Sequence, residues 1–176
     1  AHAENVLLTG GSGIDGSGKP RVRTNVRIRD GVITEIGPVR PVRGETVVDA
    51  TGLLITPGFI DIHNHLTTTL EEHLDAEAQI RQGITTVAVG LDGEGPFEVE
   101  EFMSKFDEHP PAINLLTFVG HSSIRREAMG PNTDRQATAE EILKMSVALE
   151  KGLREGGFGL STSRSEEHTS ELQSLA

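Results

Sequence analysis

The hydrophobic pattern of the chain changes at Pro57, and this change limits the folds that the chain can adopt. Before it, residues 4–56 contain short apolar stretches that alternate with polar residues, as half-buried strands do. After it, β-branched runs alternate with helical stretches that glycine or proline ends. Strands that alternate with helices favour a parallel sheet covered by helices. We therefore expect a β-rich segment followed by an α/β fold.

The second part is predicted to contain four strands, at residues 59–65, 84–89, 113–119 and 158–161. The helices expected beside them cover residues 70–82, 97–109 and 139–155. Thr138 and Glu141 have the spacing of a capping box at the start of the last helix. Because a (β/α) barrel has eight strands, four strands correspond to half of one.

In the first part, residues 22–28 alternate between apolar and basic side chains, which predicts a half-buried strand with a solvated basic face. Asp30-Gly31 predicts a tight hairpin to a partner strand, since Gly tolerates the positive φ that such a turn requires. An all-β unit of this size buries little by itself. We expect another segment to complete it.

Charge and composition exclude some partners. The net charge of -11 argues against a nucleic-acid partner, and the apolar runs are too short to span a bilayer. The chain has no Cys, so no disulfide reports its redox compartment. Ala1-His2-Ala3 has the small-x-small pattern of a signal-peptide cleavage site. The compartment therefore stays open between the cytoplasm and the periplasm or exterior.

The last residues, 164–176, are polar and follow neither the helix nor the strand period. They resemble the conceptual translation of a DNA-sequencing adapter, with a genuine polar tail as the alternative. We expect them to make few contacts with the rest of the chain, since Leu172 and Leu175 are their only large apolar residues.

The strand predicted at residues 59–65 ends in His63-Asn64-His65. Successive strand side chains point to opposite faces, so both histidines would share one face. Two neighbouring imidazoles are suitable ligands for zinc and similar metals. Asp61 shares that face and could hold a ligand histidine in its tautomer. The alternative is a pair of structural histidines on an apolar strand.

Two further candidates follow later strands, at the end where parallel barrels carry their active sites. Asp92 could be a third metal ligand or a residue of an Asp-Gly turn, and Glu94 is a weaker candidate for the same position. His121 could contact substrate or cap the following helix. Three other histidines are expected to be solvated or to belong to the tail, namely His73, His109 and His168.

These residues also carry a family resemblance. A β-rich segment running into Pro-Gly-Phe-Ile-Asp-Ile-His-Asn-His at residues 57–65 resembles the amidohydrolase superfamily. Three later stretches resemble its D-aminoacylase branch, the N-acyl-D-amino-acid deacylases, at residues 82–90, 119–130 and 157–162. The resemblance covers about residues 4–163.

The resemblance implies a zinc- or other metal-dependent hydrolase of C–N bonds in small N-acyl-D-amino acids, with His63, His65 and Asp92 as metal ligands. Residues 1–56 would be part of a small β-sandwich built from both chain ends, and residues 57–163 the first half of a barrel. D-Aminoacylases usually have a ligand Cys where Asp92 stands. The family draws two more histidines and a catalytic Asp from later strands, so the general base is not identified here.

Two other interpretations remain. A cyclic-amide hydrolase of the dihydroorotase or hydantoinase type is possible within the superfamily, but the segment around His121 argues against it. The 176-residue chain could instead be a truncated fragment without turnover, which we favour for the chain as given. A half barrel would leave sheet edges and apolar faces uncovered, which favours self-association.

Overall fold

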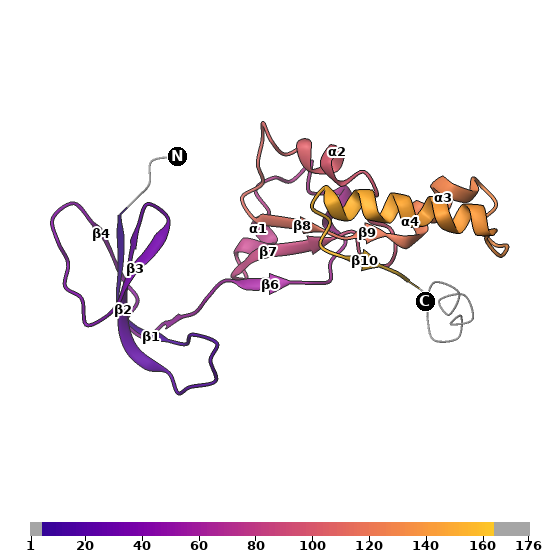
Figure 1. Ribbon diagram of the computed structural model, residues 1–176. Helices are drawn as coiled ribbons and strands as arrows, with labels where there is room; N and C mark the ends of the chain where they lie inside the picture. Colours follow the sequence, from indigo (N-terminus) through magenta and orange to yellow (C-terminus); the bar gives the residue numbers. More distant parts are fainter. Residues whose placement is uncertain (1–4, 164–176) are drawn as a thin grey trace. The chain divides into compact units, whose positions relative to one another are not determined.

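The computed structural model describes residues 5–163, which form two compact units that meet in sequence between Pro57 and Gly58. The first unit consists of strands and turns, and the second contains strands and helices (Figure 1). This agrees with the predicted change at Pro57 and confirms the α/β fold. The predictions for the tail, residues 164–176, lie outside the described residues.

The first unit is one mixed sheet with the strand order β3-β2-β1-β4. Its strands are β1 (Val6–Gly13), β2 (Val22–Arg29), β3 (Val32–Gly37), β4 (Thr46–Asp49) and β5 (Leu54–Ile55). β1 is antiparallel to β2, while β4 and β5 pair with successive parts of β1 in parallel. The predicted hairpin is present between β2 and β3, with φ of 51° at Asp30 and 75° at Gly31.

Arg23 and Arg29 on the basic face of β2 are exposed as predicted, but Arg27 is buried. Arg27 is 5% exposed, and its Nε donates to Glu45 Oε1 at 2.5 Å. Its guanidinium also pairs with Glu35 and donates to the Arg40 carbonyl oxygen. Alternation in the sequence distinguishes two faces but cannot show that carboxylates from distant segments converge on one of them. The long arginine side chain is buried because these partners satisfy its charge.

The opposite face of this sheet is apolar and open. It borders a groove of about 370 Å³ whose lining includes Val22, Ile33, Ile36 and Ile55. Val22 and Ile36 are 65% and 67% exposed, whereas Leu7 and Val26 are buried. The unit therefore has a small core, as its size predicted.

The second unit is built on parallel strands. β6 (Phe59–Asp61), β7 (Ile84–Val89) and β8 (Asn114–Thr117) form one sheet in that order. β9 (Val119–Gly120) pairs in parallel with β10 (Leu160–Ser161). Phe118 interrupts the strand predicted at residues 113–119, but its N–H still donates to the Val89 carbonyl oxygen at 3.0 Å. The parallel order therefore continues across the interruption.

Helices accompany these strands (Figure 1). They are η1 (Leu66–Thr68), α1 (Glu77–Ile80), α2 (Val99–Ser104), α3 (His121–Met129) and α4 (Ala139–Arg154). The capping box of Thr138 and Glu141 is present at the start of α4. The sequence analysis gave no range for the helix that follows His121, which is α3.

The helix predicted at residues 70–82 is wrong in extent, since only α1 forms there. Ala76 has a φ of 43°, which interrupts any helix that approaches from the N-terminal side. The turns before it bury Leu70, which is 1% exposed. Tertiary burial has therefore overridden the helical composition of this segment. The helix predicted at residues 97–109 is also shorter, as α2.

Two apolar clusters hold the second unit together. Strands, turns and α2 supply the first cluster, which includes Leu70, Val87, Val89 and Phe102. The second cluster joins α2, α3 and α4 to β9 through Val99, Val119, Ile124 and Met145. Full burial of one such side chain contributes about 1.5–3 kcal/mol. Among the described residues, no helix is long and apolar enough to cross a membrane.

Candidate metal centre

The His-x-His segment lies just beyond the end of β6, not inside the strand. The strand predicted at residues 59–65 ends at Asp61, because residues 62–65 leave the sheet for the turn that leads into η1. Asp61 Oδ1 accepts the backbone N–H of His63 at 3.1 Å. Asp61 thus contacts the backbone of the histidine segment. This hydrogen bond shapes the turn that carries the imidazoles.

Asn64 fixes the middle of this segment. Its Nδ2 donates to the Ala88 carbonyl oxygen on β7 at 3.0 Å, and its Oδ1 accepts the Leu66 N–H at 3.1 Å. The amide of Asn64 therefore ties the segment between His63 and His65 to the neighbouring strand. The sequence analysis missed this role, and its only signal is a polar side chain between two histidines.

Asp92 lies in the turn that follows β7. The Glu94 N–H donates to the Leu91 carbonyl oxygen at 3.1 Å, which closes a four-residue turn. The two central residues have positive φ, 54° at Asp92 and 78° at Gly93. Asp tolerates this region better than most residues, and Gly adopts it without steric cost. Asp92 is therefore a turn residue, and the turn also directs its carboxylate toward the histidines.

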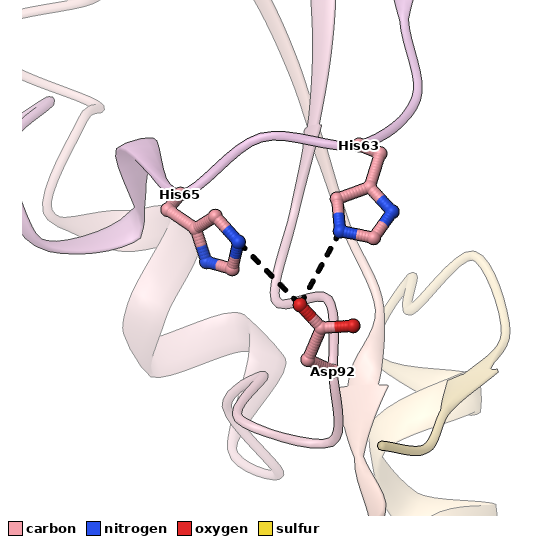
Figure 2. Close-up of side chains that lie close together, drawn as sticks. All are labelled: His63, His65 and Asp92. Carbon is pink, nitrogen blue, oxygen red and sulfur yellow. Dashed lines mark hydrogen bonds and ion pairs between the residues drawn. The ribbon is translucent and has the colours of Figure 1, made fainter. Parts of the chain in front are cut away.

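Figure 2 shows both imidazoles turned toward one carboxylate oxygen of Asp92. Asp92 Oδ2 lies 3.3 Å from His63 Nε2 and 3.4 Å from His65 Nε2. One ligand atom from each residue lies within 4.8 Å of those of the other two. Tetrahedral coordination at about 2.1 Å would separate ligand atoms by about 3.4 Å. The carboxylate oxygen and the two nitrogens therefore have the spacing of ligands around one metal ion.

The group faces solvent. The side chains of His63, His65 and Asp92 are 60%, 74% and 44% exposed. Two neutral imidazoles and one carboxylate form a donor set that suits zinc and related divalent metals. The exposed side leaves room for water or substrate as a further ligand. The residues present therefore fit a catalytic metal site with an open position.

The structure separates the other candidates from this group. Glu94 forms a bidentate pair with Arg126, at 2.7 and 3.1 Å, and this guanidinium lowers the pKa of the carboxyl. His121 is buried and begins α3. His73 and His109 are exposed, as predicted. Within residues 5–163, one group of three potential metal ligands is found, and it contains none of these residues.

A buried serine that the sequence analysis did not single out also contacts the Asp92 turn. Ser161, at the end of β10, donates to the Gly90 carbonyl oxygen and accepts the Gly93 N–H. A serine that follows an apolar strand residue is too common a pattern to signal this role from the sequence.

Parallel strands with accompanying helices, and a His-His-carboxylate group where the first two strands end, are features of metal-dependent barrel hydrolases. The sequence model of the amidohydrolase family matches residues 46–176. The chain belongs to the amidohydrolase family. The resemblance to the superfamily is thereby confirmed.

Individual relatives agree with the resemblance to the D-aminoacylase branch. D-aminoacylase of Alcaligenes xylosoxydans xylosoxydans is 35% identical over 181 residues, which cover 90% of this chain and 37% of the relative. A dihydroorotase of Bacillus licheniformis is 37% identical, but over 87 residues that cover 47% of this chain and 20% of the relative. The chain thus spans little more than a third of the D-aminoacylase it matches.

Solved structures show the same likeness. The crystal structure of N-acyl-D-glutamate deacylase from Bordetella bronchiseptica, complexed with zinc and a phosphonate inhibitor, matches with a TM-score of 0.87 and 30% identity. The match covers 99% of this chain and 42% of that structure. This agrees with the predicted fold, the start of a metal-dependent barrel preceded by a β-rich segment.

Proposed function

We propose that the chain carries part of a metal-dependent amidohydrolase site in which His63, His65 and Asp92 bind zinc or a similar divalent ion. The observation that carries the proposal is the position of Asp92 Oδ2, 3.3 Å from one histidine Nε2 and 3.4 Å from the other. Membership of the amidohydrolase family and the zinc in the deacylase from Bordetella bronchiseptica support it.

Each residue of the group has a distinct task. His63 and His65 present Nε2 atoms whose lone pairs are available when the imidazoles are neutral. Asp92 adds the negative charge that favours a divalent cation between the two rings. A metal bound there would lower the pKa of a water ligand and polarise an amide carbonyl. Asn64 and the Asp61 carboxylate keep the two imidazoles beside each other through their contacts with the backbone.

The proposal also concerns the residue that transfers the proton. Asp92 is expected to act as a ligand, and the Arg126 guanidinium already engages Glu94. A carboxylate ion-paired with arginine is a poor base because its pKa is lowered. We propose that the general base comes from later barrel strands, which residues 5–163 do not include. The 176-residue chain alone is then expected to have no turnover.

The relatives support a proposal for the substrate class. D-aminoacylase, at 35% identity, and the structurally similar N-acyl-D-glutamate deacylase are named for amides of D-amino acids. The site is therefore proposed to act on small N-acyl-D-amino acids. The cyclic-amide alternative has less support, because the dihydroorotase match covers only 47% of the chain.

The domain organisation is proposed on the same basis. Residues 1–56 would belong to a β-sandwich, and residues 57–163 would form the first half of a barrel. β6 and the segment around β10 expose apolar side chains, with Phe59 at 58%, Ile60 at 62% and Phe158 at 70% exposure. Uncovered edges of a parallel sheet favour pairing with another chain.

We propose that this second unit self-associates with another copy of the chain. The 176-residue chain should sediment as a dimer or larger species, and Ile60→Lys should shift it toward the monomer. A monomeric wild-type chain at micromolar concentration would contradict the proposal.

Zinc binding tests the proposed site directly. Zinc affinity measured by competition with a chromophoric chelator should fall more than about 100-fold in His63→Ala, beyond the 10–100-fold cost of losing a residue that only supports a ligand. His73→Ala is the matched control, since His73 is an exposed histidine of the same unit. Equal zinc affinity in His63→Ala and the wild type would refute the ligand assignment.

Turnover is tested with the same proteins. Release of free amino acid from N-acyl-D-amino acids is expected to be absent for the 176-residue chain with zinc. Zinc-dependent release that His63→Ala abolishes would show that the described residues already hold a working base.

A further inference from the structure

Ser161 bridges the two sides of the turn that carries Asp92. Its Oγ donates to the Gly90 carbonyl oxygen at 2.5 Å and accepts the Gly93 N–H at 3.2 Å. The serine is 7% exposed, so water does not readily replace these bonds. One hydroxyl thus joins a residue two positions before Asp92 to the residue directly after it.

The rest of the turn is packed closely on its surroundings. The Ser122 N–H donates to the Gly93 carbonyl oxygen at 2.9 Å. A Cβ at Gly95 would clash with the Phe118 carbonyl oxygen, and one at Gly120 would clash with the backbone of Gly95. The turn therefore lies on the backbone of the neighbouring strand, and the Ser161 hydroxyl holds it from the side of β10.

The carboxylate of Asp92 depends on this support. The side chain is 44% exposed, and its contacts toward the site are to the two histidines that would share its metal. Its direction is therefore set by a backbone turn with a φ of 54°. Metal ligands must lie within about 0.2 Å of their ideal distances, so a small rotation of this turn would cost affinity.

We propose that Ser161 is a positioning residue for Asp92, so that docking of β10 sets the geometry of the metal site. This inference rests on the proposed function, since it presumes that Asp92 is a ligand. Ser161 lies 71 residues after Gly90 in the chain, so the hydroxyl couples the last described strand to a turn formed much earlier. The site reaches its binding geometry only when β10 is in place.

Ser161→Ala tests the inference because it removes only the hydroxyl. Zinc affinity should fall about 10-fold, as for residues that support a metal ligand. Amide exchange at Gly93 should become faster, since its N–H loses its acceptor. Ser161→Thr keeps a hydroxyl and should restore both zinc affinity and slow exchange to within about threefold of the wild type.

Met145→Ala is the control for a general loss of stability, because Met145 is buried on α4 in the second cluster. It should lower stability and leave the zinc affinity of the folded chain unchanged. Unchanged zinc affinity in Ser161→Ala beside a zinc-binding wild type would overturn this inference alone. A wild-type chain that binds no zinc would overturn the proposed function and, with it, this role of Ser161.

Discussion

The two units of the chain differ in how much of their apolar surface they bury. In the first, Arg27 and Glu45 are buried, with side chains 6% and 2% exposed, while Ile36 is 67% exposed. In the second, Val87 and Leu70 are almost fully buried, and the histidines and aspartate of the candidate site face solvent. The candidate site thus lies in the unit that has the larger apolar core.

This difference follows from the number of layers in each unit. The first unit is a single sheet, and on one of its faces Glu35 of β3 and Glu45 of a loop pair with a buried arginine. The second has helices packed on its sheet, which bury the strands and leave the strand ends free. Rigid strand ends can hold exposed ligands in position, so metal binding should depend on the second unit and not on the first.

The largest expected effect comes from Asp92→Asn. Asn tolerates the positive φ of this turn but lacks the charge that favours a divalent cation. Zinc affinity should fall about 100-fold or more, since a ligand matters more than the residues that support it. Asp107→Asn, an exposed aspartate outside the group, serves as the control in the same chelator competition. Equal losses of zinc affinity in both variants would mean that the net charge of the chain, and not the position of Asp92, controls zinc binding.

A second prediction separates the units. Glu45→Gln leaves the buried Arg27 guanidinium without its buried carboxylate partner, so the urea midpoint of the first unit should fall. Zinc affinity should stay within about twofold of the wild type. Glu35→Gln is the matched control and should have a smaller effect, because the Glu35 side chain is 45% exposed. Loss of zinc binding in Glu45→Gln would break the proposed independence of the two units.

Asn64→Ala should weaken the site without removing a ligand. The amide ties the histidine segment to the Ala88 carbonyl oxygen on β7, so its loss should reduce zinc affinity about 10-fold. Asn114→Ala removes a comparable bond, from Nδ2 to the Thr85 carbonyl oxygen, away from the histidines. If both variants bind zinc as the wild type does, Asn64 does not position the ligands.

The smallest expected effect is the acid sensitivity at the start of α4. The Arg135 guanidinium and the Thr138 N–H lower the pKa of Glu141 from 4.5 to about 2. Because the folded pKa lies below the unfolded one, ionised Glu141 stabilises the fold above pH 4.5, and this contribution is lost as the pH falls toward about 2.

In Glu141→Gln, the urea midpoint of the second unit should therefore fall less between pH 5 and pH 3 than it does in the wild type. Glu140→Gln, at the neighbouring position, is the control. In the first unit, Arg27 likewise lowers the pKa of Glu45. The contribution of ionised Glu45 to stability should also be lost as the pH falls below 4.5. Glu45→Gln should remove this pH dependence. An unchanged pH profile in either variant would contradict the corresponding ion pair.

Local patterns in the sequence predicted much of the fold. The hairpin at Asp30, the strand at residues 84–89 and the capping box of α4 depend on neighbouring residues, and all three are confirmed. The burial of Arg27 and the short α1 could not be predicted in this way. They depend on partners far along the chain and on a positive φ at Ala76.

The candidate site likewise has residues that local patterns predicted and residues that they did not. His63, His65 and Asp92 were predicted because their residue types and their positions after strands suit a metal, and the structure brings them together. Asn64 and Ser161 were not, because their importance lies in hydrogen bonds to the backbone of other strands. Such bonds have no signature in a single sequence. Their contribution to the site stays a prediction until it is measured.

Anomalous diffraction at the zinc edge, from crystals of the chain grown with zinc, tests the central claim most directly. The account predicts one strong peak about 2.0–2.2 Å from the Nε2 atoms of His63 and His65 and from a carboxylate oxygen of Asp92. Zinc bound at other residues, with these three side chains more than about 4 Å from it, would contradict the claim that they form one metal centre.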